Sequence, residues 1–347
     1  MRVETEEKYY CQKPENLIKI AKELNFKETE KEEEIDEYFT DINSNFIKNR
    51  TCLRIRKTNN KTMEITHKGK SDSLFGLFCK LENNVKANIE DYDNYVSLLS
   101  SLGYYSYVEV VKNRITYELK NKNYKYSIMI DTLPEIGGFA EFEILSKRNE
   151  NTKEELKKEL SNFVSKFSKL KLTEATRPYR DIVAGHIKQK LVKNKEILNL
   201  CINLDGELSR YEKNFFKKNQ DQISKICGKP IKWREYKDNE SIDKKLYPLV
   251  EEYLESLIFD SQGLLITSKL LKQLPYTKYY FTKVNESFCK SFLKKLNIEN
   301  NNVLYIKNNE TISNILKQNN IQVKNSVIID EKDFKITNSK LLILINE

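Results

Sequence analysis

The sequence is short of histidine, of paired cysteines and of long apolar runs, and each shortage excludes a class of protein. Only two of the 347 residues are histidine, so catalysis or metal binding that depends on histidine has little to work with. The six cysteines form no CxxC pair, which argues against a zinc site or a disulfide framework and favours free thiols in a reducing compartment. Any metal ligands are therefore expected to be carboxylates.

Membrane and secretion signals are also missing. No apolar run approaches the roughly 20 residues that cross a bilayer, and the opening stretch MRVETEEKYY lacks the apolar core of a signal peptide. The composition, 39% hydrophobic and 32% charged, is typical of a globular protein. We therefore expect a cytoplasmic protein that has no membrane partner.

A formal charge of +9 predicts an affinity for anions. Nucleic acid is one candidate and a phosphate-rich small molecule is another. A nucleic-acid partner is not expected, because it calls for an exposed basic stripe with aromatics, whereas many of the basic residues here alternate with apolar ones in strand-like segments.

The chain length predicts two domains. Residues 1–190 contain short strands of alternating polarity with helices between them, which favours a largely antiparallel α+β domain. Residues 195–347 alternate short apolar strands, including GLLITSK and LLILI, with helices. That alternation predicts an α/β domain with a mostly parallel sheet.

The stretch VETEEKYY places Glu4, Glu6 and Lys8 at every second position, so in a strand all three side chains share one face. A half-exposed sheet also alternates, and for any one strand a solvated face explains the pattern. The same spacing nevertheless recurs along the first domain in Arg54 and Arg56, Thr66 and Lys68, Lys80 and Glu82, Lys112 and Arg114, Ser127, Met129 and Asp131, and Glu141 and Glu143.

Apolar residues such as Ile55, Ile128 and Phe142 occupy the intervening positions. If they pack outward against helices, the charged faces point inward and the sheet closes around a charged lumen. Isolated buried charges are costly, so such a lumen needs an anion for its bases and a cation for its acids. A polyphosphate with a divalent metal ion supplies both. By contrast, the acidic run at residues 28–37 is expected to be a solvated surface.

These residues resemble the CYTH family, the triphosphate tunnel metalloenzymes. The resemblance covers residues 1–185 and begins with the ExExK motif in VETEEKYY. Further elements follow in the family's order: DEYF, LRIRK, ITHKGK, KLE, VEVVKNR, IDTLPEIGGF and AEFEI. The run IDTLPEIGGFAEFEI is most similar to the class IV adenylyl cyclase branch. The resemblance implies an antiparallel β-barrel, the triphosphate tunnel, with flanking helices.

The resemblance also implies roles for single residues. Metal ligands for Mg²⁺ or Mn²⁺ would be Glu4, Glu6, Glu141 and Glu143. Phosphate-binding residues would be Lys8, Tyr38, Arg54, Arg56, Lys68, Lys80, Lys112, Arg114 and Arg180. Of the site residues, those expected to act in catalysis are Lys8, Arg56, Lys68 and Asp131. Two departures are a lysine at position 80, where the family often has arginine, and Pro178 before the YRD of the C-terminal segment.

Three functions stay open. The favoured one is hydrolysis of the terminal phosphate of ATP, thiamine triphosphate or inorganic triphosphate. The alternative is a class IV adenylyl cyclase that converts ATP to cyclic AMP and pyrophosphate, and an adenine pocket would distinguish the two. A non-catalytic sensor of nucleotides or polyphosphate is the third, but retention of the metal-type glutamates argues against it.

The second domain resembles a haloacid dehalogenase-like (HAD-like) phosphatase less closely. INLDGEL is similar to that family's first motif, with Asp205 retained but Asn203 where the nucleophilic aspartate belongs. An amide cannot form an aspartyl phosphate, so we expect a catalytically silent domain that serves in docking, homodimerisation or ligand sensing. The second motif is assigned to Thr267 or Ser268 and the motif lysine to Lys283. Lys307 and Asn308 replace the acidic metal ligands of the fourth motif.

Overall fold

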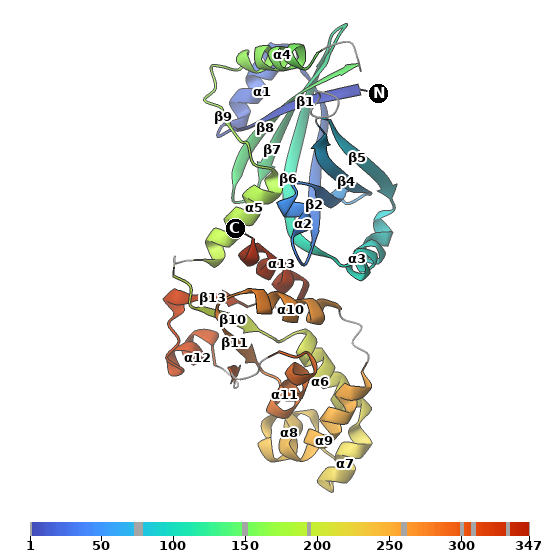
Figure 1. The fold of residues 1–347 in the computed structure, drawn as a ribbon, viewed down its shortest axis with the longest axis vertical. Helices are drawn as coiled ribbons and strands as arrows, with labels where there is room; N and C mark the ends of the chain where they lie inside the picture. The colour runs from blue at the N-terminus through green and yellow to red at the C-terminus, as the bar shows by residue number, and fades with distance from the viewer. Residues whose placement is uncertain are drawn as a thin grey trace. The chain divides into compact units, whose positions relative to one another are not determined.

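A computed structural model describes residues 2–72, 79–147, 152–192, 196–257, 262–298, 302–306, 310–330 and 334–346. The chain divides into two compact units, Met1–His186 and Ile187–Glu347 (Figure 1). Each unit is described by itself below. None of the described helices is both long and apolar enough to cross a membrane.

The first unit is built on a nine-stranded antiparallel sheet with the order β5-β4-β3-β2-β6-β7-β8-β1-β9. Figure 1 shows that this sheet is strongly curved. The strands are β1 (Arg2–Tyr10), β2 (Lys27–Asp41), β3 (Cys52–Thr58), β4 (Thr62–Asp72), β5 (Cys79–Ala87), β6 (Tyr104–Lys120), β7 (Lys125–Leu133), β8 (Gly137–Lys147) and β9 (Thr173–Glu174).

The predicted antiparallel sheet is therefore confirmed. Its strand pairs run from β5 at one edge to β9 at the other, and the described residues show no pairing between these two edges. Closure of the sheet into a barrel stays a prediction.

Three helices of the first unit, α1 (Pro14–Glu23), α3 (Tyr92–Ser101) and α4 (Lys153–Ser165), cover the apolar face of the sheet, as the alternation predicts. On β7 and β8, Ile128 and Phe142 are fully buried against Phe163 and Phe167, and helices α1 and α4 lie over this part of the sheet (Figure 1). On β3, Ile55 packs in a cluster with apolar residues of α3. The helices are α1 (Pro14–Glu23), α2 (Asn45–Lys48), η1 (Ile89–Asp91), α3 (Tyr92–Ser101), α4 (Lys153–Ser165) and α5 (Tyr179–Leu191), the last of which continues into the second unit.

Local chemistry fixes where these helices begin. Pro14 opens α1, where a missing N–H costs nothing. At α4, the Thr152 hydroxyl accepts a hydrogen bond from the Glu155 backbone N–H, and the Thr152 N–H donates to the Glu155 carboxylate. This reciprocal capping box gives hydrogen-bond acceptors to two backbone N–H groups that would otherwise have none at the start of the helix.

The acidic run corrects one expectation. Residues 28–37 lie in β2, whose burial changes along its length: its first residues are exposed, whereas Glu34, Asp36 and Glu37 are only 4%, 1% and 1% exposed. Alternation separates the last three, because Glu34 and Asp36 lie on one face of the strand and Glu37 on the other. The run is therefore solvated only in its first half.

The second unit contains a four-stranded sheet in which every pairing is parallel, with the order β12-β11-β10-β13. The predicted parallel sheet is confirmed. Its strands are β10 (Asn199–Asn203), β11 (Thr277–Thr282), β12 (Val303–Tyr305) and β13 (Ser326–Ile329). The helices are α6 (Glu207–Lys218), α7 (Gln220–Cys227), α8 (Trp233–Asp238), α9 (Glu240–Ser256), α10 (Gln262–Gln273), α11 (Glu286–Lys295), α12 (Ile312–Gln318), η2 (Val323–Asn325) and α13 (Phe334–Ile345).

Two predicted strands of this unit are helices. GLLITSK belongs to α10 and LLILI to α13, and the two helices contact each other. In α10, Ile266 and Leu270 are buried and lie four residues apart, on one helix face. A continuous run of about five apolar residues shows neither the helical nor the strand periodicity. The sequence of such a run therefore cannot distinguish a buried helix from a buried strand.

Candidate active site

The charged residues that alternate along the sheet come together on one face. We call this the charged face and define it by Lys8, Glu34, Asp36, Arg54, Arg56, Lys112, Arg114, Asp131 and Glu141. Strand register brings these residues opposite one another: Asp36 pairs with Arg56, Glu34 with Lys112, Arg114 with Asp131, and Lys8 with Glu141. Directly opposite residues in antiparallel strands share a face, so the register by itself juxtaposes the charges.

Asp36 is the centre of a first group of ion pairs. Its carboxylate accepts two hydrogen bonds from Arg56, from Nε at 2.6 Å and from Nη2 at 2.8 Å. Arg54 Nη1 lies 3.5 Å and Lys112 Nζ 3.9 Å from its Oδ2. Glu34 completes the group, because its two oxygens lie 2.9 Å from Arg56 Nη1 and 2.8 Å from Lys112 Nζ.

Asp36 stays ionised in this setting. Burial alone would raise the pKa of its carboxyl, but the hydrogen bonds from Arg56 and the charges of Arg56, Arg54 and Lys112 hold that pKa well below its usual range. Three cations, Arg56, Arg54 and Lys112, thus surround one carboxylate that stays ionised.

A second group surrounds Asp131, which is completely buried. Arg114 donates to it from Nε at 2.7 Å and from Nη2 at 2.5 Å, and Nη2 also lies 2.5 Å from a Glu141 oxygen. The Tyr179 hydroxyl donates to Asp131 Oδ2 at 2.8 Å. Lys8 Nζ sits 4.2 Å from the centre of the Tyr179 ring, and burial lowers the pKa of this lysine.

One end of the charged face is closed by apolar residues. Tyr179, the first residue of α5, is buried there in a cluster with Val110, Leu133, Phe139 and Ala175. The predicted phosphate-binding residue Tyr38 packs against this cluster, and burial raises the pKa of its hydroxyl far above the ordinary value.

Further along the sheet, a cavity of about 900 Å³ adjoins the Asp36 group, since Glu34 and Arg56 belong to its wall. The other described residues that line it include four more glutamates, two lysines and a few small or aliphatic side chains, and none of them is aromatic. Glu32 is one of these glutamates, and burial followed by the charges of Glu30 and Glu34 raises the pKa of its carboxyl. The wall thus combines both signs of charge without a ring on which a base could stack.

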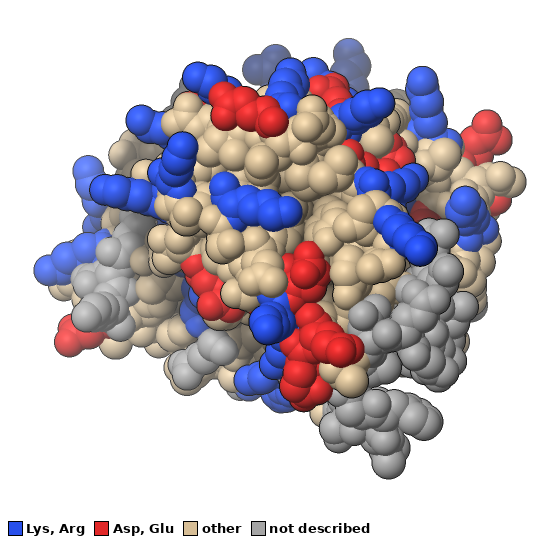
Figure 2. All heavy atoms as spheres, turned by 90° about the horizontal axis from the view of Figure 1, so that it is seen from above, with Lys and Arg blue, Asp and Glu red and all other residues tan. Residues whose placement is uncertain are grey.

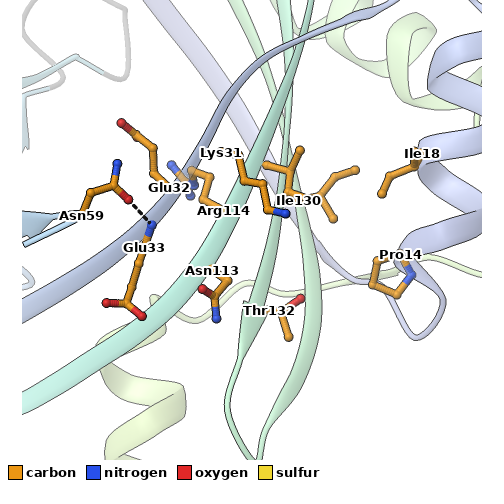
Figure 3. A pocket seen from close by; sticks show the side chains of 11 residues that line it. Pro14, Ile18, Lys31, Glu32, Glu33, Asn59, Asn113, Arg114, Ile130 and Thr132 are labelled. Atoms are coloured by element: carbon orange, nitrogen blue, oxygen red, sulfur yellow. Dashed lines mark hydrogen bonds between the residues drawn. The ribbon is translucent and has the colours of Figure 1, made fainter.

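A smaller cavity of about 350 Å³ lies beside Arg114 and Glu32. Figure 3 shows these two side chains next to each other, while Ile18 and Pro14 of α1 lie at the opposite side of the cavity. In the same view the Glu33 backbone N–H donates to the Asn59 side chain at 2.9 Å. Its described wall contains two cations, Lys31 and Arg114, together with two glutamates and four apolar residues.

The four predicted metal ligands lie on adjacent strands. Glu6 and Glu143 are register partners of β1 and β8, while Glu141 stands opposite Lys8. Glu4 is two residues from Glu6 along β1, and its side chain lies outside the part of the structure that is described. Carboxylate oxygens in this register suit Mg²⁺ or Mn²⁺. Among the side chains that are described, no three acidic, histidine or cysteine residues converge on one point, and Glu141 is turned to Arg114.

Two other predicted phosphate-binding residues, Lys68 and Arg180, stand apart from the two ion-pair groups. Lys68 lies 2.9 Å from a Glu82 oxygen and is about one-third exposed. The Arg180 guanidinium donates to the Thr51 carbonyl at 2.5 Å and approaches Asp181 at 3.3 Å. The Lys80 side chain is outside the described residues. Arg180 therefore ties the start of α5 to the start of β3.

The structure also brings in three residues that sequence reasoning left without a role: Glu34, Asp36 and Tyr179. Asp36 belongs to the DEYF element, and the alternation of positions 34, 36 and 38 is the signal that could have placed it on the charged face. Tyr179 offers no such signal, because its position depends on where α5 packs.

Basic and acidic side chains are mixed on the one face of the molecule drawn in Figure 2. Figure 2 shows Lys and Arg interspersed with Asp and Glu on the face seen there, and the residues described on that face form no continuous basic stripe. A nucleic-acid surface depends on such a stripe.

In the second unit, polar residues gather where parallel strands end. Asn203 at the end of β10 donates from Nδ2 to Asp330 Oδ1 at 2.6 Å. Asp205 Oδ1 accepts from the Thr282 hydroxyl at 3.0 Å and from the Lys283 backbone N–H at 2.9 Å. The carboxyl ends of parallel strands are where ligands usually bind in open α/β sheets.

The two residues expected in the second motif lie away from this edge of the sheet. Thr267 and Ser268 lie on α10, where Thr267 is hydrogen-bonded to Asn338 at 2.6 Å. Thr282, the last residue of β11, takes the place beside Asp205 instead. Lys307 and Asn308 are outside the described residues.

Comparison with known proteins gives one family match. The model of the CYTH domain matches residues 2–179, and no curated protein matches the chain.

Several solved structures are similar to part of the chain. The PH1819 protein from Pyrococcus horikoshii OT3 is 26% identical, with 53% of this chain and 99% of that chain covered and a TM-score of 0.43. A putative adenylate cyclase from Vibrio parahaemolyticus is 19% identical, with 52% and 98% covered and a TM-score of 0.43. The putative adenylyl cyclase HpAC1 from Hippeastrum, described as having a dominant triphosphatase activity, is 13% identical, with 54% and 96% covered and a TM-score of 0.42.

Proposed function

Since the chain belongs to the CYTH domain family, whose model matches more than half of its 347 residues, we propose that it binds a triphosphate on the charged face and hydrolyses its terminal phosphate. Residues 1–190 form the proposed catalytic domain, in which the sheet closes around the substrate. Nucleoside, thiamine and inorganic triphosphates are the candidate substrates, and Mg²⁺ or Mn²⁺ is the proposed cofactor.

One observation carries this proposal: two arginines and a lysine converge on a single buried region of β2, β3 and β6. Arg54 and Lys112 are only 7% and 2% exposed. Arg54 Nε is buried and makes no hydrogen bond to the residues that the structure describes. A buried N–H without a partner is costly, and a phosphate oxygen would satisfy it with a charge-assisted bond.

The basic side chains of the charged face would hold the phosphate chain and neutralise the charge that develops as the terminal bond breaks. Arg56 and Arg54 offer planar guanidinium groups that match phosphate oxygens. Lys8 adds a point charge near Tyr179, and Lys68 adds another at the edge of the face. Asp131 orients Arg114 through two hydrogen bonds and so acts on the substrate through that arginine.

Glu4, Glu6, Glu141 and Glu143 would hold the metal ion. When bound, it supplies charge neutralisation on the phosphates and a positioned water for attack on the terminal phosphorus. Glu141 is shared between this role and its ion pair with Arg114, which would keep the metal and the phosphate-binding arginine adjacent.

The alternative is an adenylyl cyclase, which must hold the adenosine of ATP so that its ribose hydroxyl reaches the α-phosphorus. The larger cavity next to Arg56 has no aromatic residue among those described in its wall. This observation favours hydrolysis, because an adenine ring usually stacks on or packs against such side chains.

Product analysis tests the proposal. The purified chain would be given ATP, inorganic triphosphate and thiamine triphosphate, each with Mg²⁺ and with Mn²⁺. Orthophosphate released together with the diphosphate product supports hydrolysis, and the order of rates identifies the preferred substrate. Cyclic AMP with pyrophosphate would replace the hydrolase with the cyclase, and tight binding without turnover would favour the sensor.

For residues 195–347 we propose a HAD-like domain without phosphatase activity. The parallel sheet and the position of Asn203 at the end of β10 support this proposal. With an amide at that position, the covalent step of such phosphatases has no nucleophile.

A further inference from the structure

The buried carboxylate of Asp36 lies where the proposed anionic substrate would bind. A substrate that carries several negative charges would bind among Arg54, Arg56 and Lys112, yet a permanently ionised carboxylate already occupies the centre of that group. Coulomb repulsion between this carboxylate and a phosphate opposes binding, and burial makes the repulsion stronger. The carboxylate must therefore contribute something that a neutral residue would not.

The contribution is visible in the geometry of Arg56. The arginine uses Nε and one N–H of Nη2 on the two oxygens of Asp36, and one N–H of Nη1 on Glu34. An arginine has five N–H groups in a rigid plane, so two N–H groups of Arg56 are left without a partner among the described residues. The side chain cannot rotate away without breaking the bidentate pair, and the direction of these two groups is thereby fixed.

Arg54 shows the same arrangement with looser contacts. Its Nη1 lies 3.5 Å from Asp36 Oδ2, its Nη2 donates to Thr66 Oγ1 at 3.2 Å, and its buried Nε has no hydrogen bond. Two guanidinium groups on alternate positions of β3 are thus both held by the Asp36 carboxylate, with N–H groups left over.

We propose that Asp36 is a positioning residue that fixes Arg56, and through the same carboxylate Arg54, so that their remaining N–H groups meet the phosphate oxygens as the terminal bond breaks. This inference rests on the proposed triphosphate hydrolysis and names a residue that acts on the substrate only through the two arginines. Pre-fixed donors stabilise a transition state more than donors that must reorganise.

The proposal makes opposite predictions for binding and for turnover. Asp36→Asn removes one negative charge, so the dissociation constant for inorganic triphosphate, measured by calorimetry without metal, is expected to stay constant or to fall. Since asparagine cannot accept both arginine hydrogen bonds as a carboxylate does, kcat with inorganic triphosphate and Mg²⁺ is expected to fall about 10- to 100-fold. A residue that merely holds the fold would not separate the two readouts in this way.

A second variant removes the geometry and keeps the charge. Asp36→Glu moves the carboxylate by one methylene, so kcat is expected to fall although the charge is unchanged. This variant also guards against failure of Asp36→Asn to fold. The matched control is Glu37→Gln, because Glu37 is the neighbouring residue, is equally buried at 1% exposure and faces the other side of β2. Thermal unfolding of each variant checks the fold.

A double-variant cycle tests whether Asp36 acts through Arg56. In an Arg56→Ala background, Asp36→Asn is expected to lower kcat much less than it does in the wild-type chain, because most of the effect depends on an arginine that is absent. Equal effects in both backgrounds would overturn the proposal.

The outcomes are distinguishable. If the wild-type chain neither binds nor hydrolyses any triphosphate, the proposed function fails before Asp36 is at issue. If the wild-type chain hydrolyses triphosphate and both Asp36 variants keep the kcat of the Glu37→Gln control, Asp36 has no positioning role.

Discussion

Individual side chains of the charged face neutralise one another within the protein. Arg56 and Lys112 share Glu34, and Arg114 lies between Asp131 and Glu141. Removing one member of such a pair leaves a buried charge without compensation and costs about 3–5 kcal/mol. The effects of substitutions here on stability and on turnover must therefore be measured separately.

The metal assignment is tested by replacing two carboxylates at once. The Glu4→Gln and Glu143→Gln variant is expected to lose metal-dependent turnover by at least about 100-fold, because even residues that only support a metal ligand cost 10- to 100-fold when they are changed. The measurement is hydrolysis of inorganic triphosphate against Mg²⁺ concentration. Glu7→Gln, on the outer face of β1, serves as the control. Undiminished turnover in the double variant would remove these glutamates from the metal site.

Deprotonation of Lys8 is expected to lower kcat/KM on the alkaline side of its pH profile. Burial lowers its pKa from the ordinary 10.5, and only the protonated amine attracts phosphate. As pH rises through this lowered pKa, kcat/KM is expected to fall, and to fall earlier than an ordinary lysine would cause. Arginine stays charged throughout, so Lys8→Arg should move the fall to higher pH. An unchanged midpoint in that variant would assign the titration to another group.

Sequence reasoning found most of the charged face because alternation alone decides which strand residues share a face. It missed Asp36 and Glu34 because they lie in an acidic run, and composition there suggests solvent exposure. It placed Arg180 among the phosphate-binding residues by resemblance, which stays a prediction, but it did not foresee the contact of this arginine with the Thr51 carbonyl. Such a contact depends on how α5 docks on the sheet, which no local pattern encodes.

At the scale of elements, the predictable parts are those with a clear period. In the first unit, segments with alternating polarity form strands of one antiparallel sheet, as expected. In the second unit, α10 and α13 were read as strands because their apolar runs show no period over five residues. Tertiary packing of one helix on the other, and not local preference, decides their structure.

The start of β8 gives a prediction at this scale. A Cβ at Gly138 would lie 2.4 Å from the Cys11 carbonyl oxygen, and the Cys11 N–H donates to the Gly138 carbonyl at 2.9 Å. Gly138→Ala is therefore expected to lower the free energy of unfolding by about 1–3 kcal/mol, measured from the urea midpoint. Gly185→Ala in α5 is the control, since a Cβ there meets its nearest atom at 3.6 Å. A Gly138→Ala variant as stable as this control would contradict the close approach.

At the scale of the whole molecule, two sheets of different kinds lie in one chain. The antiparallel sheet carries nearly all of the candidate chemistry, and the parallel sheet presents Asn203, Asp205, Thr282 and Asp330 at its carboxyl edge. Strand type was predictable for both sheets, because connections of alternating strands and helices favour parallel pairing. The residues beside Asp205 were not, because assigning them required knowing which segments are strands.

A substitution at Asn203 tests the proposal that the second unit has no phosphatase activity. Asn203→Ala removes the 2.6 Å hydrogen bond to Asp330 and the 2.9 Å bond from the Asp205 N–H. It is expected to destabilise the chain by about 1–3 kcal/mol while leaving triphosphate turnover and the background rate with p-nitrophenyl phosphate unchanged. Loss of a measurable phosphatase activity in this variant would show that the second unit is an enzyme.

The ion pairs of the charged face have a consequence for how the protein responds to salt. A protein that binds nucleic acid gains affinity by expelling small ions into bulk water, and its affinity therefore falls steeply as salt is added. Here the carboxylates of Glu34, Asp36 and Asp131 already act as built-in counterions for the arginines. An incoming phosphate meets bases that these carboxylates already neutralise, so few mobile ions are released and binding should depend only weakly on ionic strength.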